Sequence, residues 1–327
     1  CELWFLNRNK PKAHRDRVLM LDARNIYRKV TRKIYDFSPE QLQNLLAIIW
    51  LYRGEGDRFL DLVARYIGQS LHEARACFET ADREVGAIHA LPDYQTALTD
   101  LRRVMQPFLE TVSADATHAE VRRQLEEACK TLNIDAEAFK SAIEAERKQW
   151  QKQAKDNAGL NGMVKRLLPL AERSRDLIKQ SDLLYKLACR LIDICEGELA
   201  AKESELWISR DVNKARKAVD EARQVSVDQF KQVRYFHKQA VWLIERFPMA
   251  ALRDVEGLVR LVDRTELEVN DWSLTPGRYV GVAQEEKDDG FDFEEALRDI
   301  HIELEGLNAE AVELAAKIKK NFEELGI

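Results

Sequence analysis

Glycine and proline are scarce in this chain, with 13 Gly and 7 Pro among 327 residues, about half of their usual share. Turn-rich β-sandwiches and barrels need more of both, so the shortage argues against those folds and favours long helices. No apolar run approaches the ~20 residues that span a bilayer, and the opening residues have no signal-peptide pattern, so no membrane partner is expected. Five widely spaced cysteines, an odd number, indicate reduced thiols in a cytoplasmic protein.

The sequence also lacks the usual marks of an enzyme site. Six histidines are scattered without metal-ligand spacing. No nucleophile elbow, P-loop or dinucleotide fingerprint occurs. We therefore predict no catalytic, cofactor-binding or metal-binding residue in this chain. Its 45% hydrophobic and 33% charged residues are sufficient for a folded core, and the length allows two domains.

The opening segment is basic and strand-like. Residues 1–33 hold ten Lys or Arg and three acids, which leaves +7 there and −13 on the remainder of a chain of net charge −6. Two apolar runs, Cys1–Leu6 and Val18–Leu21, predict a β-hairpin, which is marginal alone in water. No later run indicates a further strand, so we expect the missing strands to precede Cys1 and interpret the chain as a C-terminal fragment. The alternative is a small α+β element that packs on this chain's own helices.

The remainder has the spacing of amphipathic helices. Ser38-Pro39-Glu40-Gln41 predicts a helix start with a capping box, and Gly54 predicts its end. A second helix is expected to end at Gly68. Further helices are predicted over residues 70–88, 92–112, 117–132, 135–156, 162–202, 210–247 and 248–268, with Pro107 and Pro169 kinking or dividing two of them. The predicted fold class is mainly α: a long-helix bundle or coiled coil with a small N-terminal β-hairpin left over from an α/β methyltransferase sheet.

The helical pattern stops at residues 270–281, where two Gly and one Pro within six residues predict a loop. An acidic linker follows, and residues 293–325 predict a final helix. Its apolar residues alternate steps of three and four, the seam of a coiled coil. The seam residues are Leu297, Ile300, Leu304, Leu307, Leu314 and Ile318. Binding to a partner helix and packing on this chain's own bundle are equally consistent with that stripe.

Three strings together carry a family resemblance: WFLNRNK at 4–10, VLMLDAR at 18–24 and LTPGRYVG at 274–281, the last before an acidic linker and a terminal helix. In this order they resemble the modification subunit of type I restriction-modification systems. The resemblance covers about residues 1–67 and 260–327. The expected segments are 1–36 (last methyltransferase strands), 37–68 (helical continuation), 69–269 (helical insertion), 270–290 (loop and acidic linker) and 291–327 (coiled-coil helix).

The resemblance implies transfer of a methyl group from S-adenosylmethionine to the N6 of adenine in duplex DNA. Such enzymes hold the cofactor with a Gly-rich loop after a strand and the flipped base with an Asn-Pro-Pro-Phe/Tyr motif. Neither motif occurs in this sequence. By family order both would lie before Cys1, so the intact subunit would bind S-adenosylmethionine and this fragment alone would bind no cofactor.

The resemblance also implies partners, namely the specificity and restriction subunits of a type I complex. We expect the loop to dock rather than read bases, through Thr275, Pro276, Gly277, Arg278 and Tyr279, and the terminal helix to lie against the specificity subunit. Candidate DNA phosphate contacts are Lys10, Lys12, Arg15, Arg32 and Lys33. For Arg32 and Lys33, beside Tyr27 and Tyr35, a solvated face next to a strand end is an equally good interpretation. The alternative function is a non-enzymatic helical adaptor or scaffold.

Overall fold

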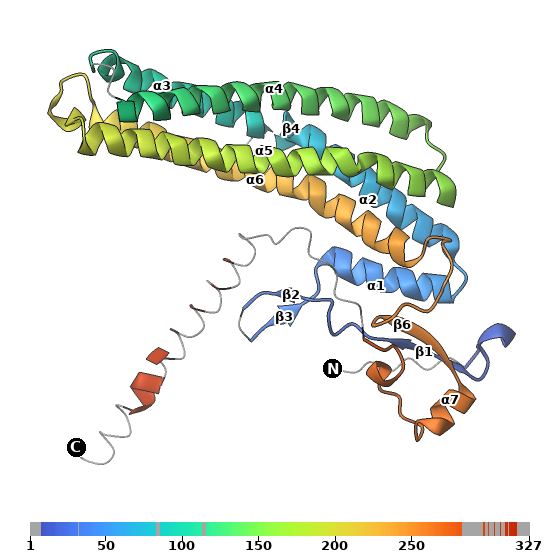
Figure 1. The fold of residues 1–327 in the computed structure, drawn as a ribbon. Coiled ribbons are helices and arrows are strands. Elements are labelled where there is room, and N and C mark those ends of the chain that lie inside the picture. The colour runs from blue at the N-terminus through green and yellow to red at the C-terminus, as the bar shows by residue number, and fades with distance from the viewer. Residues whose placement is uncertain are drawn as a thin grey trace. The chain divides into compact units, whose positions relative to one another are not determined.

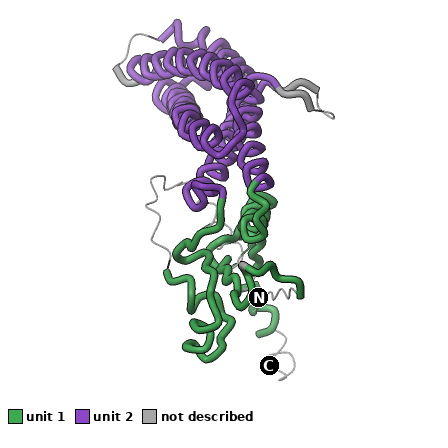
Figure 2. The backbone as a smooth tube through the Cα atoms, turned by 90° about the vertical axis from the view of Figure 1, so that its right-hand side faces the viewer, with its two compact units in different colours: residues 1–56, 251–327 green, residues 57–250 purple. Residues whose placement is uncertain are grey.

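The computed structural model describes residues 8–31, 33–82, 86–112 and 116–282, and eleven helical positions between Leu297 and Ile318. The fold is mainly α, as predicted, with short antiparallel strand pairs (Figure 1). Two compact units make up the chain: unit 1 is residues 1–56 and 251–327, and unit 2 is residues 57–250 (Figure 2). These units are coarser than the five segments expected from the sequence, whose limits stay predictions. Among the described helices, none has the length and apolarity needed to cross a membrane.

Unit 2 is a bundle of long helices. Its helices are α2 (Gly56–Ala76), α3 (Ala90–Leu109), α4 (Ala116–Lys152), α5 (Asn157–Gly197) and α6 (Ser209–Arg246). Helix α4 packs on α5, and α6 packs on both α5 and α3 (Figure 1). Aromatic rings fill the interior, for example Phe139 and Phe230 with ring centroids 5.9 Å apart. Each helix buries its apolar face in this interior, and that burial stabilises the helices far more than intrinsic helix propensity does.

Several helix limits in unit 2 differ from prediction. Helix α2 continues through Gly68 to Ala76, and strands β4 (Thr80–Asp82) and β5 (Gly86–Ile88) replace the predicted end of the next helix. Helix α4 is continuous where two helices were expected, because Leu132 and Ala136 are both buried and packing overrides the weak break between them. Two prolines lie inside α3 and α5 without dividing either helix.

Unit 1 contains a two-stranded ribbon. Strand β1 (Arg17–Leu21) pairs antiparallel with β6 (Val259–Asp263), with Val18 opposite Val262. A strand at 18–21 was predicted, whereas its expected partner, residues 1–6, lies outside the described residues. The prediction that no later segment forms a strand, and that residues 248–268 form a helix, is wrong.

The local backbone explains that error. Gly257 has φ +70°, a left-handed turn that ends any helix before the strand. Asp263 caps the next helix, α7 (Arg264–Val269), by accepting a 2.9 Å hydrogen bond from the Glu266 N–H. Only the six residues of α7 are helical, and the valines before them are extended, which suits their branched side chains.

A hairpin and a helix also belong to unit 1. Strands β2 (Arg28–Lys29) and β3 (Tyr35–Asp36) form the small N-terminal hairpin, at other residues than predicted. Helix α1 (Pro39–Tyr52) begins with the predicted capping box: Gln41 N–H donates to Ser38 Oγ at 3.2 Å, and Ser38 N–H donates to Gln41 Oε1 at 2.9 Å. The helix ends just before Gly54, which has φ +77°.

Candidate docking site

The predicted docking loop folds back on the β1–β6 ribbon. Its Tyr279 and Val280 share one small buried cluster with Met20 of β1, Val262 of β6 and Leu267 of α7. The Val280 carbonyl accepts a 2.6 Å hydrogen bond from the Gly257 N–H. The strings VLMLDAR and LTPGRYVG, about 250 residues apart in the sequence, therefore belong to one folded element.

The loop residues divide into an anchor and an exposed edge. Tyr279 is only 5% exposed, and its hydroxyl donates a 2.6 Å hydrogen bond to the Ser273 carbonyl. The short 3₁₀ turn η3 (Pro276–Arg278) leads into it. Thr275 and Arg278 are exposed, so a docking partner would meet these two side chains while the Tyr279 ring fixes the loop. Docking itself stays a prediction.

A second contact joins the two strings through a charged pair. The buried Asp22 carboxylate accepts hydrogen bonds from Arg24 Nε at 2.9 Å and Arg24 Nη2 at 2.6 Å. The bonded guanidinium holds the pKa of Asp22 below its usual range. The same guanidinium lies against Gly277, where an added Cβ would be 2.5 Å from Arg24 Nη2. Glycine at position 277 thus permits this close approach, and a side chain there would require the Arg24 guanidinium to shift.

The candidate phosphate contacts are only partly brought together. Lys10 and Arg15 line one open depression of about 510 Å³ with Arg8, Asn9 and Asp16. Arg8 was not among the predicted contacts, although the density of basic residues at the start of the sequence was a usable signal. Lys10 Nζ also donates to the Arg17 carbonyl at 2.6 Å, which fixes its position at the rim.

The other basic candidates lie elsewhere in unit 1. Lys12 is in the 3₁₀ turn η1 (Lys12–His14) and is exposed, outside the lining of the depression. Lys33 is exposed at the turn between β2 and β3, and Arg32 lies outside the described residues. The candidate contacts therefore belong to more than one surface of unit 1.

The terminal helix presents its stripe uncovered. The described seam residues are helical and between 46% and 60% exposed, namely Leu297, Ile300, Leu304, Leu314 and Ile318. Leu307 lies outside the described residues. Within the part of the chain that is described, no element covers this stripe.

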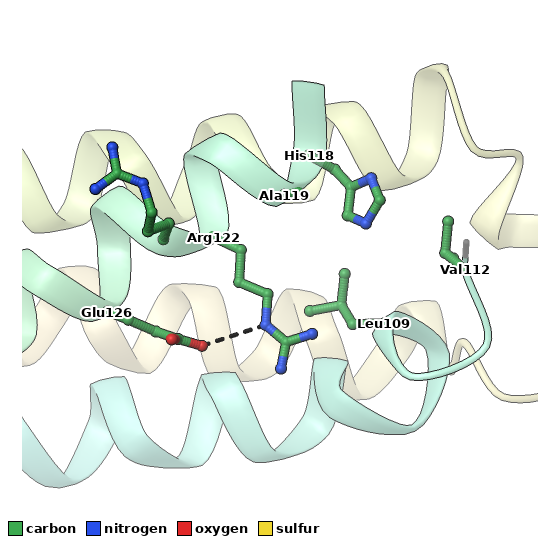
Figure 3. Close-up of a pocket in the computed structure, with 7 residues that line it drawn as sticks. Leu109, Val112, His118, Ala119, Arg122 and Glu126 are labelled. Carbon is green, nitrogen blue, oxygen red and sulfur yellow. Dashed lines mark hydrogen bonds and ion pairs between the residues drawn. The ribbon is translucent and has the colours of Figure 1, made fainter. Parts of the chain in front are cut away.

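A small pocket in unit 2 was missed by sequence reasoning (Figure 3). It has a volume of about 220 Å³ and lies between the end of α3 and the start of α4, lined by Leu109, Val112, His118, Ala119, Arg122, Arg123 and Glu126. His118 is 4% exposed, and its Nδ1 has no hydrogen-bond partner among the described residues. Arg122 Nε donates to Glu126 Oε1 at 3.2 Å, and Arg123 Nη2 lies 2.7 Å from Glu120 Oε1, so both cations of the pocket are already paired. No nucleophile lines the pocket, and no group of three metal-ligating side chains occurs in the described chain.

Comparison with known proteins agrees with the motif resemblance over a limited stretch. Across 61 residues the chain is 48% identical to the type I restriction enzyme HindI methylase subunit of Haemophilus influenzae. The stretch is 19% of this chain, and the chain spans 14% of the length of that relative. No family model matches the chain, and no solved structure matches it. The chain is therefore similar, in that stretch, to a methylase subunit of a type I restriction enzyme.

Proposed function

We propose that this chain is the C-terminal part of a type I modification subunit, a DNA adenine-N6 methyltransferase that uses S-adenosylmethionine. Its own role is to supply a helical scaffold and to dock the specificity subunit. The observation that supports this best is the shared core of the two family-like strings around Tyr279. A chance resemblance of short strings gives no reason for them to meet in space.

The loop is built as a preformed contact. Tyr279 and Val280 are held in the core by packing and hydrogen bonds, so Thr275 and Arg278 sit on a backbone that is already ordered. A contact surface ordered in advance loses little conformational entropy on binding. The terminal helix adds a stripe suited to a helix of the specificity subunit, in the manner of a coiled coil.

Methyl transfer is assigned to another part of the intact subunit. The present sequence has no Asn-Pro-Pro-Phe/Tyr motif and no Gly-rich loop after a strand, which a flipped adenine and its cofactor would need. S-adenosylmethionine, when bound there, supplies the methyl group. The residues of this chain position the methyl-transferring part of the subunit on its partners. The basic depression around Lys10 and Arg15 contacts the phosphates of duplex DNA.

Co-expression with a type I specificity subunit tests the docking proposal. We expect a stable complex that Arg278→Glu weakens at least about tenfold, because the exposed charge is reversed without disturbing the Tyr279 anchor. Lys130→Glu, an exposed charge reversal on α4, is the matched control and should leave affinity unchanged. Equal binding of Arg278→Glu and the parent would remove the loop from the interface. Absence of any complex would remove the docking proposal altogether.

A non-enzymatic helical adaptor is the second candidate. The long helices of unit 2 favour it, since the 61-residue similarity leaves most of the chain without a matched relative. The codons directly upstream of Cys1 distinguish the two candidates. An Asn-Pro-Pro-Phe/Tyr tetrapeptide encoded there in frame supports the methyltransferase, and an initiator Met beside Cys1 supports the adaptor.

A further inference from the structure

Unit 1 exposes a group of large apolar side chains in and beside the β2–β3 hairpin and on α1. Tyr27, Tyr35, Phe37, Leu42 and Leu46 are each between 43% and 54% exposed. We refer to these five residues as the aromatic–leucine patch. A single exposed apolar side chain is ordinary, whereas a contiguous group marks a binding surface.

Two contacts and one sequence spacing connect parts of the patch. The Tyr27 and Tyr35 rings meet edge to face with centroids 5.2 Å apart. Gln41 Nε2 donates a 3.1 Å hydrogen bond to the Tyr27 carbonyl, which fastens the hairpin to the first turn of α1. Phe37 and Leu42 stand at the N′ and N4 positions around the Ser38 cap, the spacing of a hydrophobic staple.

The patch is also held in shape without a partner. Arg28 forms a two-pronged ion pair with Asp36 across the hairpin, at 2.9 and 2.8 Å. The capping box fixes the start of α1, and Leu42 and Leu46, one turn apart, share a helix face. A ligand would therefore meet a preformed apolar surface.

The charge around the patch indicates the sign of its ligand. The hairpin segment 27–37 holds four basic residues and one acid, a net charge of +3. The terminal segment 293–325 holds nine acids and four basic residues, a net charge of −5. Opposite charges around two apolar surfaces favour their association and disfavour pairing of each surface with its own copy.

We propose that the C-terminal segment, residues 293–325, docks its apolar stripe on the aromatic–leucine patch of the same chain. The stripe offers Leu297, Ile300 and Leu304 at helical spacing, all about half exposed, which is the arrangement that fits an apolar groove. Residues 283–296 join it to the loop at 270–282, and at ~3.3–3.6 Å per residue these fourteen residues reach at most roughly 45–50 Å. One stripe contacts one surface at a time, so the specificity subunit and the patch compete for this helix. The proposal itself does not depend on that subunit.

Hydrogen exchange on the full chain tests this docking. We expect slow exchange of amides in residues 293–325, and at least about tenfold faster exchange there in Leu42→Glu/Leu46→Glu, because the apolar contact is lost. Ile300→Glu/Leu304→Glu should expose the patch peptides in return. Leu183→Glu, at an α5 position with 50% exposure, is the matched control and should change neither.

A second variant and three alternative outcomes decide the proposal if the double leucine variant is ambiguous. Lys33→Glu leaves α1 untouched and should raise tail exchange about threefold. It therefore tests the same docking if the double leucine variant loses helicity. A fast-exchanging tail in the parent would overturn the proposal. Protection lost on about 100-fold dilution would assign the helix to a second copy instead. Patch variants that weaken duplex DNA binding with unchanged tail exchange would make the patch a nucleic-acid surface.

Discussion

Replacing Tyr279 by alanine should destabilise unit 1 selectively. The ring is 5% exposed and packs in one cluster with Met20 and Val262. Truncation of a buried aromatic side chain costs about 3–5 kcal/mol. Tyr279→Phe keeps the ring and loses only the hydroxyl hydrogen bond to the Ser273 carbonyl, so it should cost about 0.5–1.5 kcal/mol.

Hydrogen exchange read by peptide provides the assay. The Asp22 N–H donates to the Leu258 carbonyl at 2.8 Å, and the Gly257 N–H donates to the Val280 carbonyl at 2.6 Å. Both amides exchange only when this core opens, and each ~1.4 kcal/mol lost speeds exchange about tenfold. Tyr279→Ala should therefore accelerate these peptides by at least about 100-fold, and Tyr279→Phe by about tenfold or less.

A control variant separates the two units. Leu184 of α5 is fully buried in unit 2, and Leu184→Ala should accelerate exchange in the bundle without changing the β1 and β6 peptides. If Tyr279→Ala left exchange in those peptides within about threefold of the parent, the claim that this ring anchors the loop would be refuted.

Three further predictions concern titratable groups. Hydrogen bonding to Arg24 lowers the pKa of Asp22, so the pair stabilises unit 1 above the unfolded carboxyl pKa, and this stability is lost as pH falls through the folded value. Asp22→Asn should abolish this acid-side loss in urea titrations followed by hydrogen exchange. Burial lowers the pKa of His237, so unit 2 should lose stability as pH falls below about 6.5, where the unfolded imidazole gains a proton before the folded one does. His237→Gln should reduce the pH dependence of the thermal unfolding midpoint between about pH 7 and 5. Burial raises the pKa of Cys77, and that of Cys195 to about 11, so a disulfide reagent should label these two thiols only after denaturation, and rapid labelling in the folded chain would contradict their burial.

Local signals were sufficient for much of the fold. The capping box at Ser38 and Gln41 is a short-range pattern and was found where expected. The long helices follow from apolar spacing, although their limits moved wherever packing overrode a weak break, as it did at Gly68. Each of these features depends on residues within a few turns of one another, which a sequence displays directly.

Strand β6 shows what local patterns do not reveal. A short segment such as Val259–Asp263, with three apolar residues among five, fits a helix or a strand equally well. The decision comes from its pairing with β1, about 240 residues earlier in the chain, and from the positive φ of Gly257. Neither the pairing nor the backbone angle is a property of the run itself.

The candidate docking site was likewise predictable only in part. The LTPGRYVG string singled out Arg278 and Tyr279 together, and only packing distinguishes the exposed guanidinium from the buried ring. The contact between Arg24 and Gly277 was not predictable, because it joins two strings distant in sequence. The pocket beside His118 carried no recognisable spacing, since its residues come from two helices that meet only in the bundle.

Complex formation with a type I specificity subunit tests the central claim most directly. On gel filtration with light scattering, the mixture should give one species with the summed mass of both proteins. The Arg278→Glu variant should return the two separate masses at the same concentrations, while Lys130→Glu should co-elute as the parent does. Separate elution of the parent chain and the specificity subunit would contradict the claim that this chain docks the specificity subunit of a type I enzyme.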